Sequence, residues 1–137
     1  MLIYVPTKKQ AFFRHQQDVW FYDAAQKKWS QANAKGPKPP FGIDATACYD
    51  SRRDRIYLGG GSYPVTPAGG NALWIYDLKT DTWIDPKPKG SAGGSTSYAT
   101  NYALMAYDSA NDVVVLIRHS AAKEHLGVFI YDPATNA

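Results

Sequence analysis

Residues 72–83 read ALWIYDLKTDTW, and related stretches occur on both sides of them at nearly equal distances. The upstream copy, 19–29, reads VWFYDAAQKKW, and the downstream copy, 128–137, reads VFIYDPATNA. Their Tyr-Asp pairs begin at Tyr22, Tyr76 and Tyr131, so the steps are 54 and 55 residues. A repeat of about 50 residues is typical of solenoids, propellers and other arrays of equivalent units.

Each unit also has an earlier half that repeats. Residues 45–61 read ATACYDSRRDRIYLGGG, and residues 102–118 read YALMAYDSANDVVVLIR. In both, a short polar turn separates two apolar runs, which predicts a β-hairpin. The central unit is therefore expected to contain four strands, at about 44–50, 55–60, 72–77 and 82–85. No segment has a helical period, and Gly and Pro interrupt the chain throughout, so an all-β fold is predicted.

The number of strands is expected to differ between the units. Residues 2–5 occupy the second-strand position of the first unit, and the chain ends in the third strand of the last unit. We therefore predict antiparallel sheets arranged 3 + 4 + 3, forming one partial domain over residues 1–137. Its parts are expected to be the end of one blade (1–40), a complete blade (41–89) and an incomplete blade (90–137).

The central unit resembles the kelch repeat, whose blades form a β-propeller. The resemblance is carried by Gly59-Gly60 at the end of the second strand, Tyr76 on the third and Trp83 on the fourth. It implies that the glycines allow a sharp bend or a positive φ, and that the tyrosine and tryptophan fill the contact between adjacent sheets. The same structural role is expected of Tyr22, Trp29 and Tyr131. An unrelated β-sandwich is the alternative fold.

An arc of this length cannot close a ring by itself, because propellers generally contain about four to eight blades. Both outermost sheets should then present an uncovered face. We expect the chain to be a fragment of a longer protein, or to need further blades or self-association to close a ring. The isolated chain should tend to oligomerise or aggregate through its exposed faces and strand edges.

Composition excludes several other classes of protein. The net charge of +3 is too small to indicate nucleic-acid binding, and the sequence contains no apolar run long enough for a membrane span. The single cysteine, Cys48, cannot form an internal disulfide, and its strand-like surroundings predict a buried thiol.

Blade topology would place the long loops on one face and the tight turns on the other. The expected long loops are 5–18, 31–44, 61–71, 85–97 and 118–127, and charged residues give this face +5 against −2 for the turn face. A basic face favours encounter with an acidic partner. The simpler interpretation, that these lysines keep the loops soluble, explains the charge equally well.

Candidate binding residues also fall on the expected long-loop face. They are Arg14, His15, Tyr63, Arg118, His119 and His125. Arginine can grip a carboxylate or phosphate with two hydrogen bonds, and histidine can donate or accept near neutral pH. Plain exposure to solvent is the alternative for the loop histidines. The spacing indicates no metal site, and neither a catalytic motif nor a cofactor motif is present.

These observations favour a binding scaffold that recognises a protein or glycan through its long-loop face. The alternative implied by the resemblance is a fragment of a sugar-modifying enzyme, similar to a sialic acid mutarotase or to galactose oxidase. A third possibility is a purely structural arc in a larger assembly. Because a fold hosts many functions, the choice depends on the site.

Overall fold

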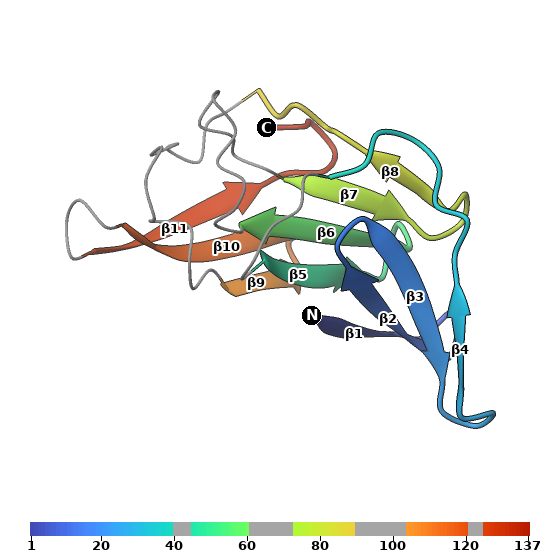
Figure 1. Cartoon of the computed structure of the whole chain (residues 1–137). Coiled ribbons are helices and arrows are strands. Elements are labelled where there is room, and N and C mark those ends of the chain that lie inside the picture. The colour runs from blue at the N-terminus through green and yellow to red at the C-terminus, as the bar shows by residue number, and fades with distance from the viewer. Residues whose placement is uncertain (40–44, 61–72, 90–103, 121–124) are drawn as a thin grey trace.

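The computed structural model describes residues 1–39, 45–60, 73–89, 104–120 and 125–137, and every regular element in these ranges is a β-strand (Figure 1). The strands form three antiparallel sheets, each ordered as in the chain. Sheet A contains β1 (Leu2–Val5), β2 (Gln10–His15), β3 (Asp18–Asp23) and β4 (Lys28–Gln31). Sheet B contains β5 (Ala45–Asp50), β6 (Arg55–Gly60), β7 (Trp74–Asp77) and β8 (Thr82–Ile84). Sheet C contains β9 (Leu104–Asp108), β10 (Val113–Ser120) and β11 (His125–Tyr131).

The all-β prediction is confirmed, but the first sheet contains one strand more than expected. Residues 10–15, placed by the prediction inside a long loop at 5–18, form β2, so the described sheets have four, four and three strands. Residues 2–5 are consequently the first strand of sheet A, and not its second. The prediction failed because β2 lacks a clean apolar alternation and because the turn before it, Pro6-Thr7-Lys8-Lys9, has none of the Tyr-Asp-Ser signal of the later units.

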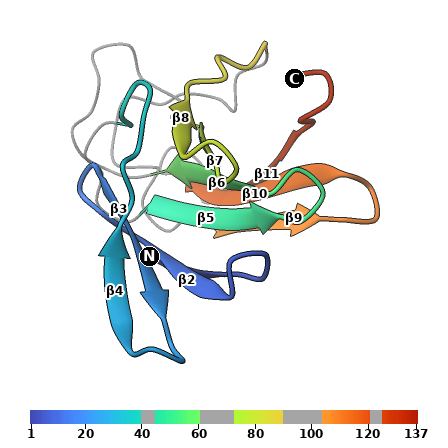
Figure 2. The ribbon, with the colours of Figure 1, turned by 90° about the vertical axis from the view of Figure 1, so that its right-hand side faces the viewer.

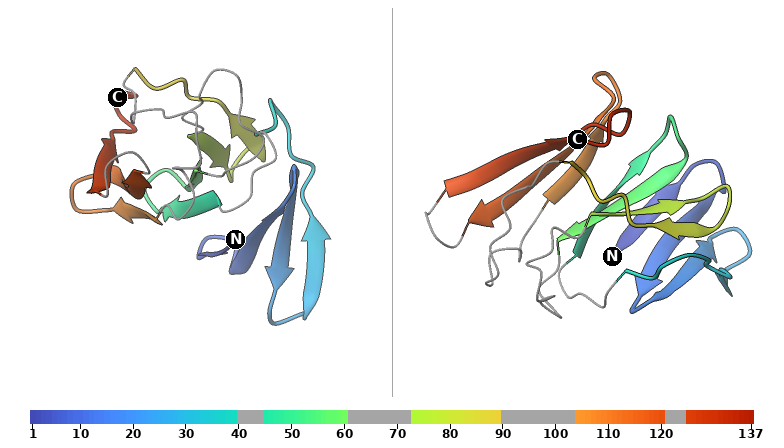
Figure 3. Two further views of the ribbon diagram at one scale, coloured as in Figure 1. Left: turned by 60° about the vertical axis from the view of Figure 1, so that its left-hand side comes forward. Right: turned by 90° about the horizontal axis from the view of Figure 1, so that it is seen from above.

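The three sheets lie side by side in chain order, with sheet B between sheets A and C (Figure 3). The first strands β1, β5 and β9 are neighbours at one edge of this stack (Figures 1 and 2). Connecting segments cover the opposite edge. Lys35 follows sheet A and pairs with the outer strand of sheet B, where its carbonyl accepts from the Trp83 backbone N–H at 2.8 Å. Lys89 follows sheet B and donates to the Asn136 carbonyl at 3.0 Å.

The apolar core lies in two layers between the sheets. Sheets A and B bury Val5, Phe12, Val19, Phe21, Ile56, Leu58, Tyr76, Leu78 and Trp83. Sheets B and C bury Cys48, Tyr57, Ile75 and Val114. Because side chains alternate between the two faces of a strand, every strand of sheet B contributes to both layers. β6 ends at Gly60, as expected, but Gly59 has no positive φ, and its missing side chain makes room for Met105.

One turn motif recurs four times, and in three of the copies the turn closes a hairpin. A tyrosine lies at or next to the end of a strand, the following Asp accepts hydrogen bonds from the turn, and an Asp or Asn five residues after the tyrosine accepts from its hydroxyl. The tyrosine pairs are Tyr49–Asp54 at 2.9 Å, Tyr76–Asp81 at 3.1 Å, Tyr107–Asp112 at 2.7 Å and Tyr131–Asn136 at 2.9 Å. The accepting residues all have φ between 51° and 58°, a conformation that Asp and Asn tolerate better than most residues. This motif fixes both ends of each turn and therefore the strand register.

Candidate interaction surface

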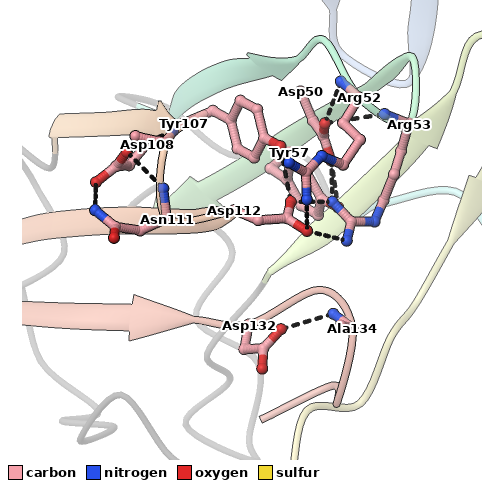
Figure 4. Close-up of polar contacts among 11 residues, drawn as sticks. Asp50, Arg52, Arg53, Tyr57, Tyr107, Asp108, Asn111, Asp112, Asp132 and Ala134 are labelled. Atoms are coloured by element: carbon pink, nitrogen blue, oxygen red, sulfur yellow. Dashed lines mark hydrogen bonds and ion pairs between the residues drawn. The ribbon is translucent and has the colours of Figure 1, made fainter.

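A polar joint connects the first turn of sheet B to the first turn of sheet C (Figure 4). Arg53 donates to both oxygens of Asp112, at 2.6 and 2.9 Å, and Arg52 donates to the same carboxylate at 2.7 Å. Arg53 also donates to the fully buried Asp50 at 3.0 Å, and the Tyr57 hydroxyl donates to the same carboxylate at 3.3 Å. The joint thus orients one sheet on the next by charge-assisted bonds.

The joint holds its charges in the ionised form. Hydrogen bonds from Arg53 and Tyr107 lower the pKa of Asp112, and the bond to Asp112 raises the pKa of Arg53 despite its desolvation. Burial and the bond to Asp112 together raise the pKa of Tyr107 to about 12. The described carboxylates and guanidinium groups of the joint bind one another, so the joint links the two sheets.

A weaker joint connects the first turn of sheet A to both tight turns of sheet B. Thr7 donates to Asp54 at 2.8 Å, and the Lys8 Nζ lies 4.0 Å from Asp81. In both joints the earlier sheet supplies the donors and the later sheet supplies the carboxylate. Counting from the turns, Lys9 of sheet A occupies the position of Asp54 and Asp112, and Lys27 occupies that of Asp81 and Asn136.

The face of sheet A that points away from sheet B is aromatic, and we call it the aromatic face. Cross-strand pairs bring together Leu2 with Phe13, Phe13 with Trp20, and Tyr22 with Trp29. Tyr22 and Trp29 have ring centroids 4.9 Å apart, matching the 4.8 Å of Tyr76 and Trp83 in sheet B. Trp83 is only 1% exposed, whereas Trp29 is 47% exposed. The same side-chain pair is therefore covered in sheet B and uncovered in sheet A.

The far face of sheet C is aliphatic, and we call it the aliphatic face. Its exposed members include Leu104, Val128 and Ile130, the last two being 62% and 64% exposed. By position in the repeat, Val128 corresponds to Val19, and Ile130 corresponds to Phe21 in sheet A and Ile75 in sheet B, all of which are buried between sheets. Large contiguous apolar surfaces of this kind mark interaction sites.

The predicted binding residue Arg14 is half-buried within β2 and faces sheet B. Its guanidinium donates to the Pro39 carbonyl at 3.4 Å, and burial lowers its pKa. His15 ends β2, is exposed and stacks on Phe13 with ring centroids 6.5 Å apart. Arg14 therefore anchors the segment after sheet A, and only His15 of this pair is open to solvent.

The remaining predicted binding residues belong to a different part of the molecule. Arg118 and His119 lie in β10, His125 begins β11, and their backbones pair within one hairpin. The loop expected at 118–127 is thus largely strand. Sheet B separates this hairpin from Arg14 and His15, so the structure does not bring the two Arg-His pairs together. Tyr63 lies outside the described residues.

The revised strands also change the expected charge division. Lys8 and Lys9 follow β1 and therefore belong to the tight-turn face. Moving them reduces the long-loop face from +5 to +3 and brings the turn face from −2 to 0. The basic face is correspondingly a weaker feature than the sequence suggested.

The described ranges contain neither a cluster of metal ligands nor a reactive thiol. No group of three or more His, Cys, Asp or Glu side chains there could hold a metal ion. The Cys48 thiol is buried, and its pKa is raised to about 12 by desolvation and by Asp50, so it stays protonated. Within the same ranges, no helix is long and apolar enough to cross a membrane.

Part of this surface could be recognised in the amino-acid sequence. The Tyr-x4-Asp/Asn spacing was visible, and its replacement by Lys at Lys9 and Lys27 marks sheet A as different from the other two. The exposure of Trp29 was not visible, because it depends on which neighbouring sheet is present. Leu2, Tyr4, Phe13 and Trp20 were missed for that reason.

No family profile matches this chain. Over 75 residues it is 29% identical to dynein regulatory complex subunit 7 of Chlamydomonas reinhardtii. The match covers 55% of this chain and 6% of that protein, so the chain spans only a small part of the relative's length.

Proposed function

We propose that this chain is a protein-interaction scaffold built from β-propeller-like blades, and that its aromatic face docks against a β-sheet of another protein molecule. The observation that carries the proposal is the uncovered Tyr22–Trp29 pair, whose counterpart Tyr76–Trp83 is fully covered by the neighbouring sheet. The repeat therefore provides sheet A with a sheet-packing surface that the described residues leave uncovered.

The chemistry of the aromatic face suits a protein partner. Tyrosine and tryptophan dominate the energetics of protein interfaces because they bury large areas with few rotatable bonds. Tyr4 is 61% exposed and adds a hydroxyl at the rim, next to the basic turn that ends in Lys9. The similarity to a subunit of a regulatory complex agrees with a role in assembly.

The kelch-like blade is the form of scaffold that we propose. The equivalent hairpins of the three sheets, the stack of sheets in chain order and the adjacent first strands support it. The described residues support the scaffold more than the enzyme alternative, because Cys48 is a buried, protonated thiol and the charged groups of the polar joint bind one another.

Photo-cross-linking tests the docking surface. Benzoylphenylalanine is placed at Tyr4 on the aromatic face, and at Lys79 on an exposed turn of sheet B as the matched control, in cells that make the protein. We expect discrete protein adducts from position 4 that are several-fold stronger than those from position 79. Indistinguishable adducts from the two positions would refute the docking surface.

A further inference from the structure

The structure assigns a specific occupant to the aromatic face: we infer that it is the aliphatic face of sheet C in a second copy of this chain, packed head to tail. This inference rests on the proposed docking function and names its partner. It follows from the way each sheet packs on the one before it, and from a reversal of charge at the two free ends.

The two internal interfaces use the same residue positions. At the first, Phe12 on the second strand of sheet A packs against Tyr76 on the third strand of sheet B, with ring centroids 5.5 Å apart. At the second, Tyr57 of sheet B packs against Tyr131 of sheet C at 5.8 Å. The next residue pair in this series is Val115 of sheet C with Tyr22 of the following sheet, which is sheet A of another copy.

The two free faces carry the same kinds of side chain as the two sides of the internal interfaces. The aliphatic face presents Val128 and Ile130 where the covered faces of sheets A and B present Val19, Phe21 and Ile75. The aromatic face presents a Tyr–Trp pair. In sheet B the equivalent pair, Tyr76 and Trp83, is buried in one core layer with Val19 and Phe21 of sheet A. Packing one on the other repeats an interface that the chain already makes.

Charge at the turns fits the same pairing, with its polarity reversed. The internal joints place Lys8 or Arg53 of the earlier sheet beside an Asp of the later sheet. In sheet C the position of Arg53 is Asn111, which donates to the carboxylate of Asp108, and sheet A carries Lys9 at the acceptor position. Lys9 would thus meet Asn111 and Asp108, and no arginine of sheet C itself. Had sheet C kept the arginine, two like charges would meet.

Head-to-tail contacts close when the rotation between copies completes a ring. The described residues form three sheets, so two such sets joined at both ends would contain six, and closed propellers contain about four to eight. A closed dimer would cover all four free faces without any new type of contact.

Complementation of two disabled chains tests the inference. Trp29→Lys disables the aromatic face, and Ile130→Lys disables the aliphatic face; both residues are exposed, so both variants should fold, as circular dichroism would verify. By light scattering, the native chain should have about twice its mass of 15.1 kDa, and each variant alone should be a monomer. An equimolar mixture should form a one-to-one dimer through its one intact joint. Dimers of Ile130→Lys alone would overturn the head-to-tail arrangement.

A charge exchange gives an independent test of the register. Asn111→Arg should weaken association roughly tenfold by facing Lys9. Adding Lys9→Asp to the same chain should restore or exceed the original association, because it recreates the Arg53–Asp112 joint. Failure of the second change to rescue the first would overturn the proposed register. A native chain that is monomeric but still forms adducts with a different protein from Tyr4 would overturn the second copy as the occupant and leave the docking function standing.

Discussion

Replacement of Trp83 by alanine measures how much a covered repeat position contributes to stability. The side chain is 1% exposed and lies against Tyr76, with ring centroids 4.8 Å apart. A tryptophan buries about 150–250 Å², which at about 25 cal/mol per Å² corresponds to ~4–6 kcal/mol. Large-to-small substitutions of buried aromatics cost ~3–5 kcal/mol, so we expect a loss of about 4 kcal/mol.

Trp29→Ala is the matched control, because Trp29 pairs with Tyr22 as Trp83 pairs with Tyr76. At 47% exposure it loses only about half of the buried area, and we expect ~2 kcal/mol. Urea unfolding followed by circular dichroism gives both values, at a protein concentration where light scattering shows monomers. Equal losses for the two variants would refute the claim that only sheet B has its aromatic pair covered.

A milder change keeps this comparison valid if Trp83→Ala does not fold. The Trp83 indole N–H is buried without a hydrogen-bond partner in the described structure, so Trp83→Phe removes apolar area but no hydrogen bond. We expect a cost of ~1–2 kcal/mol, which leaves a domain of ordinary stability folded.

Three further changes test the hairpins, the joint and a close backbone contact. Tyr76→Phe removes the hydroxyl that donates to Asp81 and should cost ~0.5–1.5 kcal/mol in urea unfolding, whereas Tyr22→Phe should cost almost nothing, since lysine replaces the acceptor there; equal costs would contradict the motif. The pKa of Asp112 is lowered by its arginine partner, so its contribution to stability is complete above about pH 4 and is lost as the pH falls further; Asp112→Asn should flatten this acid loss, and an unchanged pH profile would contradict the joint. Gly36→Ala should cost more than Gly59→Ala, because Gly36 has a φ of +82° and a methyl group there meets a backbone carbonyl, whereas at Gly59 it meets the flexible end of Met105; thermal melting that ranks them the other way would contradict this account.

The sequence predicted most of the strands because the Tyr-Asp turns repeat. The expected strands at 55–60 and 82–85 agree with β6 and β8 to within a residue. β2 escaped prediction because its hairpin, beginning after Tyr4, has Lys9 at the place where the motif elsewhere has Asp or Asn. The turn signal before β2 is weak, and the strand is stabilised by the packing of Phe12 in the core between the sheets.

The site was harder to predict than the fold. Charged loop residues were chosen because recognition often resides on loops, yet Arg14 proved to be an internal anchor and Arg118 part of a strand. The surface that the structure singles out is apolar, and its residues look like ordinary core residues in the sequence. Only the contrast between Trp29 and Trp83, equal in sequence and unequal in exposure, reveals it.

The most direct test of the account is a cross-link from Tyr22 in the purified chain. Benzoylphenylalanine is introduced at this position, and the labelled copies are mixed with heavy-isotope copies before irradiation and mass spectrometry. The account predicts adducts between light and heavy copies that map to residues 113–117 around Val115. Adducts confined to one copy, adducts that map to other segments, or no adducts would contradict it.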